Sequence, residues 1–163
     1  MTVQAFVFVE TQFDNLGDAL INRELISLVS RHADVTIGLS RVPKTFQEKI
    51  GYDYLNQFTL DMSRGRSRFL LRILIKAMAG QSCYLFLSPG GWIGEIDGRL
   101  NLRSWFHTLL YHLLSGFGVK ICQFGVSYED LGAKLSLLLR ARSGALSQHY
   151  VRDSGSEEVM RAL

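Results

Sequence analysis

The sequence predicts a single α/β domain, with a parallel β-sheet and helices on both of its faces. Short apolar segments alternate along the chain with longer segments whose apolar residues recur at helical spacing, which is the order of βαβ units. The chain has 163 residues, of which 47% are hydrophobic and 20% are charged. This composition is enough for one packed core. We therefore expect residues 1–163 to form one domain built on a sheet of about five parallel strands.

The first part of the chain predicts two strands and a helix. Residues 4–10 are mostly apolar, as in a strand that is buried on both sides. Residues 18–32 carry an apolar stripe at helical spacing, and residues 35–39 form a second short strand. Residues 43–62 have no clear period, and their four aromatic side chains predict an ordered excursion.

The middle of the chain predicts a helix, a strand and a second helix. Residues 68–79 have a helical pattern, and residues 83–88 are an apolar segment that favours a third strand. Residues 102–117 form a strong helix, which Gly116 and Gly118 terminate.

The last part predicts two further strands and two helical segments. Residues 120–126 are expected to form the fourth strand, and residues 131–146 a helix. Residues 149–152 are a short fifth strand, and residues 156–163 begin a helix. Because crossover connections in parallel sheets are right-handed, the carboxyl ends of all strands meet at one edge.

Four residues that follow predicted strand ends are expected to lie along this edge. They are Asn15, Gly90, Gly125 and Arg152. Ligands of open α/β sheets bind in the crevice outside the carboxyl ends of the strands. This edge is therefore where we expect the functional site.

The phrase Asn15-Leu16-Gly17-Asp18 directly precedes the first predicted helix. Asn and Asp are common N-cap residues, so a purely structural role would explain Asn15 or Asp18. A cap does not call for Gly17, which indicates either a close backbone approach or a positive φ. We expect all three residues to contact substrate.

A glycine pair, Gly90 and Gly91, follows the third predicted strand. Adjacent glycines expose backbone N–H groups and can form an anion-binding nest, although a simple tight turn has the same composition. We expect both glycines to contact substrate. Glu95 and Asp97, just beyond, are candidate proton donors or solvated surface carboxylates.

The most specific phrase is Val151-Arg152-Asp153, followed by Ser156. Arg152 emerges at a strand end, where a guanidinium can bind a carboxylate or a phosphate in bidentate geometry. Asp153 could orient that guanidinium, and Ser156 could cap the following helix. The alternative is a surface Arg–Asp pair beside a cap, which contributes little energy. We expect Arg152 and Ser156 to contact substrate.

Together, these phrases resemble the N-terminal half of the polysaccharide pyruvyl transferase family. The matching segments are residues 15–21, the glycine turn and residues 150–158. The sequence departs from the family pattern at Trp92, where a third glycine is usual, and at Tyr128-Glu129, where Gly-Pro is common.

The resemblance implies a fold and an activity. Family members resemble GT-B enzymes, in which two Rossmann-like domains face each other across a cleft, so residues 1–163 would be the N-terminal domain without its C-terminal partner. The implied reaction transfers the carbon skeleton of phosphoenolpyruvate to two hydroxyls of one sugar, which yields a pyruvate ketal and phosphate. The saccharide acceptor is free or lipid-linked. No metal or other cofactor is expected, the general acid and base are not identified, and residues 1–163 alone are expected to be inactive.

Two alternative functions stay open. The chain could be half of a GT-B glycosyltransferase that binds a sugar or a nucleotide sugar. It could also be a non-catalytic interaction module, whose exposed cleft face recruits a C-terminal half or a second copy of itself. No Walker A loop, G-x-S-x-G elbow or G-x-G-x-x-G fingerprint occurs.

Charge and cysteine content restrict the partners and the compartment. Residues 1–62 carry 5 Lys and Arg against 8 Asp and Glu, and residues 63–163 carry 13 against 7. The basic residues concentrate in residues 64–76, which indicates a solvated helix face or a peripheral contact with an anionic membrane. No aromatic-interleaved basic stripe points to nucleic acid. Cys83 and Cys122 lack metal or redox spacing, and no secretory signal is apparent, so we expect a cytosolic protein.

Overall fold

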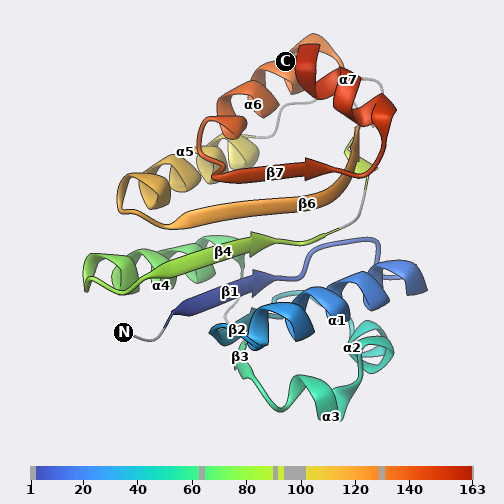
Figure 1. Cartoon of the computed structure of the whole chain (residues 1–163), viewed down its shortest axis with the longest axis vertical. Helices are drawn as coiled ribbons and strands as arrows, with labels where there is room; N and C mark the ends of the chain where they lie inside the picture. Colours follow the sequence, from blue (N-terminus) through green and yellow to red (C-terminus); the bar gives the residue numbers. More distant parts are fainter. Residues whose placement is uncertain (1–2, 63–64, 90–91, 94–101, 129–130, 163) are drawn as a thin grey trace.

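A computed structural model describes residues 3–62, 65–89, 92–93, 102–128 and 131–162, with only the backbone described at 92–93. Its strands are all parallel and follow the order β3-β2-β1-β4-β6, with β7 and the short β5 both pairing with β6 (Figure 1). The strand bounds are β1 (Gln4–Phe8), β2 (Asp34–Gly38), β3 (Thr59–Asp61), β4 (Cys83–Leu87), β5 (Trp92–Ile93), β6 (Lys120–Tyr128) and β7 (Gln148–Val151). The predicted α/β fold with a parallel sheet is confirmed.

Helices cover both faces of the sheet (Figure 1). Their bounds are α1 (Leu16–Ser30), α2 (Lys44–Ile50), α3 (Tyr52–Leu55), α4 (Arg66–Met78), α5 (Leu102–Gly116), α6 (Ala133–Ser143) and α7 (Ser154–Ala162). Helices α1, α2 and α3 pack with β1 and β2 in one hydrophobic cluster. Helices α4 and α5 pack on the opposite face, and α6 lies next to α5. No helix within the described ranges combines the length and the apolarity that crossing a bilayer requires.

Strand β1 shows why the two helix layers lie on opposite faces. Successive side chains of a strand point to opposite sides. Phe6 and Phe8 accordingly join the cluster beneath α4 and α5, whereas Ala5 and Val7 join the cluster beneath α1. All four side chains are at most 4% exposed. The near-continuous apolar run at residues 4–10 is thus the signature of a strand covered on both sides.

Of two local expectations, the ordered excursion is confirmed and the position of Gly125 is wrong. The excursion at residues 43–62 is ordered and contains α2, α3 and the edge strand β3. Gly125 does not follow a strand end, because β6 continues to Tyr128. It has a φ of 67° and sits at an irregularity of the β6–β7 register, a conformation that glycine adopts without steric cost.

The strand order reverses between β1 and β4, which are neighbours in the sheet. One half of the sheet runs outward from β1 to β2 and β3, and the other runs from β4 to β6 and β7. In open α/β sheets, the crevice at such a reversal is the common ligand site. The loops that follow β1 and β4 border this crevice.

Candidate functional site at the carboxyl edge of the sheet

The turn between β1 and α1 is closed by Asn15. Its side-chain oxygen accepts a hydrogen bond of 2.8 Å from the backbone N–H of Gly17, which makes Asn15 the N-cap of α1. Gly17 does not have a positive φ, so that interpretation of the glycine was wrong. Its nearest neighbour is the capping side chain itself, since a Cβ at Gly17 would lie 3.1 Å from the Asn15 side-chain oxygen.

Asp18 turns inward from this loop and is only 3% exposed. Its carboxylate accepts a hydrogen bond from the Thr11 hydroxyl. The backbone carbonyl of Asp18 accepts a hydrogen bond of 2.7 Å from the Asn22 side-chain amide, and the Asn22 side-chain oxygen accepts one of 3.2 Å from the Ser88 hydroxyl. This polar chain joins the loops after β1 and β4, so Asp18 fixes the two walls of the crevice.

The second turn, between β7 and α7, is built around Asp153. One carboxylate oxygen accepts a hydrogen bond of 2.8 Å from the Ser156 N–H, and the other accepts one of 2.9 Å from the Ser127 hydroxyl. These hydrogen bonds lower the pKa of Asp153 below its usual range, because they stabilise the charged form. Ser156 is 1% exposed, and its hydroxyl oxygen accepts a hydrogen bond of 2.9 Å from the Tyr128 N–H. The turn is thereby tied to the end of β6.

Arg152 lies between these anchored residues, and its side chain is exposed. Its backbone N–H donates to the Val126 carbonyl over 3.1 Å, which fixes the main chain at the strand end. Among the residues that the structure describes, the guanidinium forms no hydrogen bond and no ion pair within 4 Å. Both oxygens of the adjacent Asp153 are already engaged. Arg152 therefore presents its guanidinium at the edge, where its charge also helps to lower the pKa of Asp153.

The predicted residues share this edge but do not form one cluster. Asn15, Gly17 and Asp18 border the crevice after β1, and Arg152 follows β7, three strands away. At roughly 4.8 Å between neighbouring strands, the two strands are roughly 14 Å apart. Such a spacing suits two substrates side by side better than one small anion. Gly90, Gly91, Glu95 and Asp97 lie outside the described residues.

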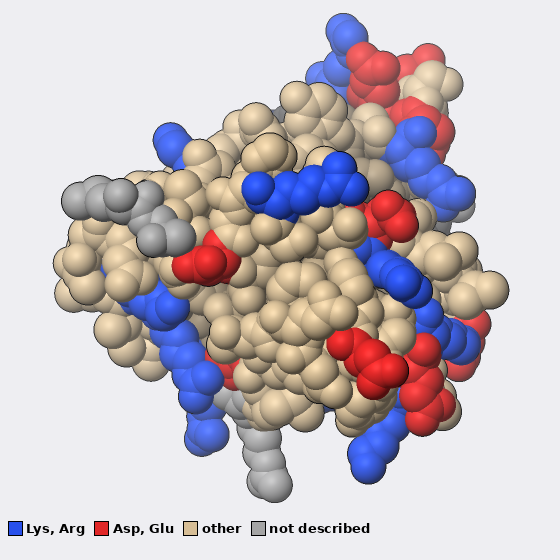
Figure 2. All heavy atoms as spheres, turned by 60° about the horizontal axis from the view of Figure 1, so that its bottom comes forward, with Lys and Arg blue, Asp and Glu red and all other residues tan. Residues whose placement is uncertain are grey.

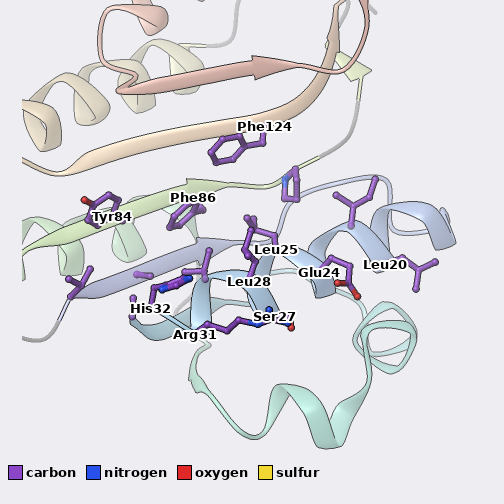
Figure 3. Close-up of a pocket in the computed structure, with 16 residues that line it drawn as sticks. Leu20, Glu24, Leu25, Ser27, Leu28, Arg31, His32, Tyr84, Phe86 and Phe124 are labelled. Atoms are coloured by element: carbon purple, nitrogen blue, oxygen red, sulfur yellow. The ribbon is translucent and has the colours of Figure 1, made fainter.

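An apolar groove of about 980 Å³ runs along α1, on the face of the sheet that α1 covers (Figure 3). Its wall is formed by Leu20, Leu25 and Leu28 of α1. Its floor contains the rings of Tyr84, Phe86 and Phe124, whose planes are nearly parallel and whose successive centroids are 6.4 and 6.2 Å apart. The row continues beyond the groove to Tyr150, whose ring centre is 5.4 Å from that of Phe124. Sequence reasoning missed this row, although the spacing of Tyr84 and Phe86 by two residues on one strand was a signal for it.

The basic residues of α4 have several distinct environments. Arg66 pairs with Glu10 and lies 4.9 Å from the centre of the Phe8 ring, whereas Arg72 pairs with Asp61 at 2.7 Å. Arg68 is exposed and has no partner among the described residues. Arg64 lies outside the described ranges.

Several buried titratable groups are not among the predicted site residues. His107 of α5 is 5% exposed, and burial together with Arg66, Arg103 and Arg142 lowers its pKa to about 4. Its Nε2 is 3.3 Å from the Ser67 hydroxyl. Both cysteines are buried free thiols, and burial raises their pKa. Over the described ranges, no three His, Cys, Asp or Glu side chains gather as a set of metal ligands.

Comparison with known proteins identifies the family of the chain. No curated protein matches the chain. The family model for polysaccharide pyruvyl transferase matches residues 15–163 of the 163-residue chain. The match begins at the N-cap of α1 and includes both turns described above. The chain therefore belongs to the polysaccharide pyruvyl transferase family.

Proposed function

We propose that the chain binds phosphoenolpyruvate at the carboxyl edge of the sheet and serves a ketal-forming pyruvyl transfer to a saccharide. The observation that carries the proposal is the position of the Asn15–Gly17–Asp18 turn at the strand-order reversal, within the segment that matches the family. In this reaction, two sugar hydroxyls form C–O bonds to C2 of phosphoenolpyruvate. The C2–O bond to phosphate breaks, and of the two protons that the hydroxyls lose, one is balanced by the proton taken up at C3 and the other leaves with inorganic phosphate.

Arg152 is proposed to bind the carboxylate or the phosphate of the donor. A guanidinium offers two parallel N–H donors to such an anion. The exposed side chain of Arg152 has no hydrogen-bond partner among the described residues, so no described contact has to break on binding. Asp153, with both oxygens engaged, holds the turn rather than neutralising Arg152 through a hydrogen bond.

The turn after β1 is proposed to face the second substrate, the saccharide acceptor. Asn15 is exposed there, and the backbone N–H groups of Leu16 and Asp18 donate to no described residue. These groups stand at the N-terminus of the 15-residue helix α1, which favours negative charge or hydroxyl oxygens. For the side chains of Asp18 and Ser156, which are buried and hydrogen-bonded, we propose positioning roles.

The test is a titration of phosphoenolpyruvate into the protein, followed by amide chemical shifts. We expect a dissociation constant in the millimolar range, or about −4 kcal/mol. Arg152→Ala should abolish binding without lowering the thermal midpoint. Arg152→Lys should retain part of the affinity, because it keeps the charge and loses the bidentate geometry.

Arg31→Ala is the matched control, since Arg31 is exposed and follows α1 at the opposite edge of the sheet. It should bind like the wild type. Equal affinity in the wild type and in Arg152→Ala would remove Arg152 from the site. Tighter binding of a uridine diphosphate sugar than of phosphoenolpyruvate would favour the glycosyltransferase alternative.

A further inference from the structure

Helices α4 and α5 expose large apolar side chains on the side that faces away from the sheet. Their buried residues, such as Ile73 and Tyr111, belong to one cluster against one face of the sheet, so both outer sides point the same way. The exposed apolar residues are Leu71, Ile75 and Met78 of α4, and Leu102, Phe106, Leu109, Leu113 and Phe117 in or just after α5. We call these eight residues the α4/α5 outer face.

The exposure of this face is large for apolar side chains. Met78 is 63% exposed and Leu109 is 65% exposed. The apolar residues recur every three or four positions along both helices, so they form continuous stripes rather than scattered contacts. Exposed apolar stripes of this kind mark a surface that another phase or molecule covers.

The helices that carry this face have charged side chains of one sign, and two of their arginines, Arg66 and Arg72, are paired with Glu10 and Asp61. Helices α4, α5 and the adjacent α6 contain no Asp or Glu, and their basic residues are Arg66, Arg68, Arg72, Lys76, Arg103, Lys134, Arg140 and Arg142. The helices on the other face of the sheet carry both signs, with Glu24, Glu48 and Asp53 close in sequence to Arg23 and Lys49. Figure 2, which brings the lower end of Figure 1 forward, likewise shows basic and acidic residues interspersed.

We infer that the α4/α5 outer face docks on an anionic membrane surface. Amphipathic helices that lie in a bilayer interface combine Leu and Phe on the inserted side with Lys and Arg beside it. Anionic headgroups attract each nearby basic side chain, and the apolar side chains enter the boundary of the acyl chains. A protein partner would instead favour a face depleted of charge at its core, with mixed charges at its rim.

This docking also orients the carboxyl edge of the sheet. Helices α4 and α5 both precede parallel strands, so they run antiparallel to the strands and begin near that edge (Figure 1). In the docked orientation, the carboxyl edge of the sheet therefore lies beside the membrane-bound face, and the opposite face of the sheet, which α1 covers, is turned toward water. A saccharide carried on a lipid would meet the edge in this orientation, although the docking itself does not depend on the proposed reaction.

The test is sedimentation of the protein with sucrose-loaded vesicles of phosphatidylcholine, with or without phosphatidylglycerol. We expect binding to the anionic vesicles and at least about tenfold weaker binding to the neutral ones, since several basic residues contribute. The Met78→Glu/Leu109→Glu variant should bind at least about tenfold more weakly, because two inserted apolar side chains are lost. Arg68→Glu should weaken binding at least about fivefold.

Leu20→Glu/Leu28→Glu is the matched control. Both leucines are exposed on α1, on the opposite face of the sheet, so this variant should bind like the wild type. Circular dichroism at 222 nm checks that each variant is folded to the same extent. The inference is overturned if the wild type fails to sediment with anionic vesicles, if it binds neutral vesicles equally well, or if the control variant loses as much binding as Met78→Glu/Leu109→Glu. Phosphoenolpyruvate binding, measured without vesicles, is a separate outcome.

Discussion

Replacing Ser156 by Ala tests whether the serine of the Val-Arg-Asp phrase holds the structure together. Its hydroxyl is 1% exposed and accepts a hydrogen bond of 2.9 Å from the Tyr128 N–H. Alanine removes the acceptor and leaves that N–H at the buried end of β6 without a partner. An unsatisfied buried donor costs about 1–3 kcal/mol, and we expect about 2 kcal/mol here. For a domain of this size, that corresponds to a thermal midpoint lower by about 4–8 °C.

The assay is urea unfolding followed by circular dichroism, with Ser154→Ala as the control. Ser154 is exposed one residue after Asp153, and its substitution should change the free energy of unfolding by less than about 0.5 kcal/mol. The denaturant slope should be the same in all three proteins, since the surface exposed on unfolding is unchanged. The reasoning is refuted if Ser156→Ala is as stable as Ser154→Ala.

Three other substitutions test the turn after β1 and the acid stability. Asn15→Ala should lower the free energy of unfolding by about 1 kcal/mol in urea titrations, because α1 loses its N-cap; no change would show that the cap contributes nothing. Gly17→Ala should not gain the roughly 1 kcal/mol by which alanine is usually favoured over glycine inside a helix, because its Cβ would lie 3.1 Å from the Asn15 oxygen, and a gain of that size in the same titrations would contradict that geometry. The pKa of His107 is lowered to about 4, so the unfolded chain binds its proton first, and stability should fall by up to about 3 kcal/mol as the pH drops from about 6.5 to 4. His107→Asn should flatten this dependence in thermal melts, and a pH dependence as steep as that of the wild type would exclude His107 as the cause.

The order of elements was predictable because each has a strong local pattern. The apolar run at residues 4–10 and the stripe at residues 18–32 fix β1 and α1 to within a few residues. Strand β3 was not predictable, because its three residues alternate little and owe their conformation to pairing with β2. The length of β6 was underestimated, since the positive φ of Gly125 lets the strand continue through an irregularity that looks like a strand end in sequence.

The candidate site was predictable in position but not in contacts. Parallel strand order alone places Asn15 and Arg152 at one edge. Sequence does not show that Asp18 and Ser156 turn into the protein, because that depends on Thr11 and on the N–H of Tyr128, which lie in other segments. The exposed stripes of α4 and α5 follow from helical periodicity, but only the packed structure shows which side of each helix is buried.

The most direct test of the proposed site is to map phosphoenolpyruvate on the backbone amides of the labelled protein. The proposal predicts that the largest shifts occur at Arg152, Asp153 and the neighbouring amides of the turn between β7 and α7, and that amides at the opposite edge, such as Ala33 and Leu146, do not move. Inorganic phosphate should shift a subset of the same amides, because it offers only one of the two anionic groups. Shifts confined to the opposite edge or to the groove beside α1, with residues 152–153 unmoved, would contradict the proposal.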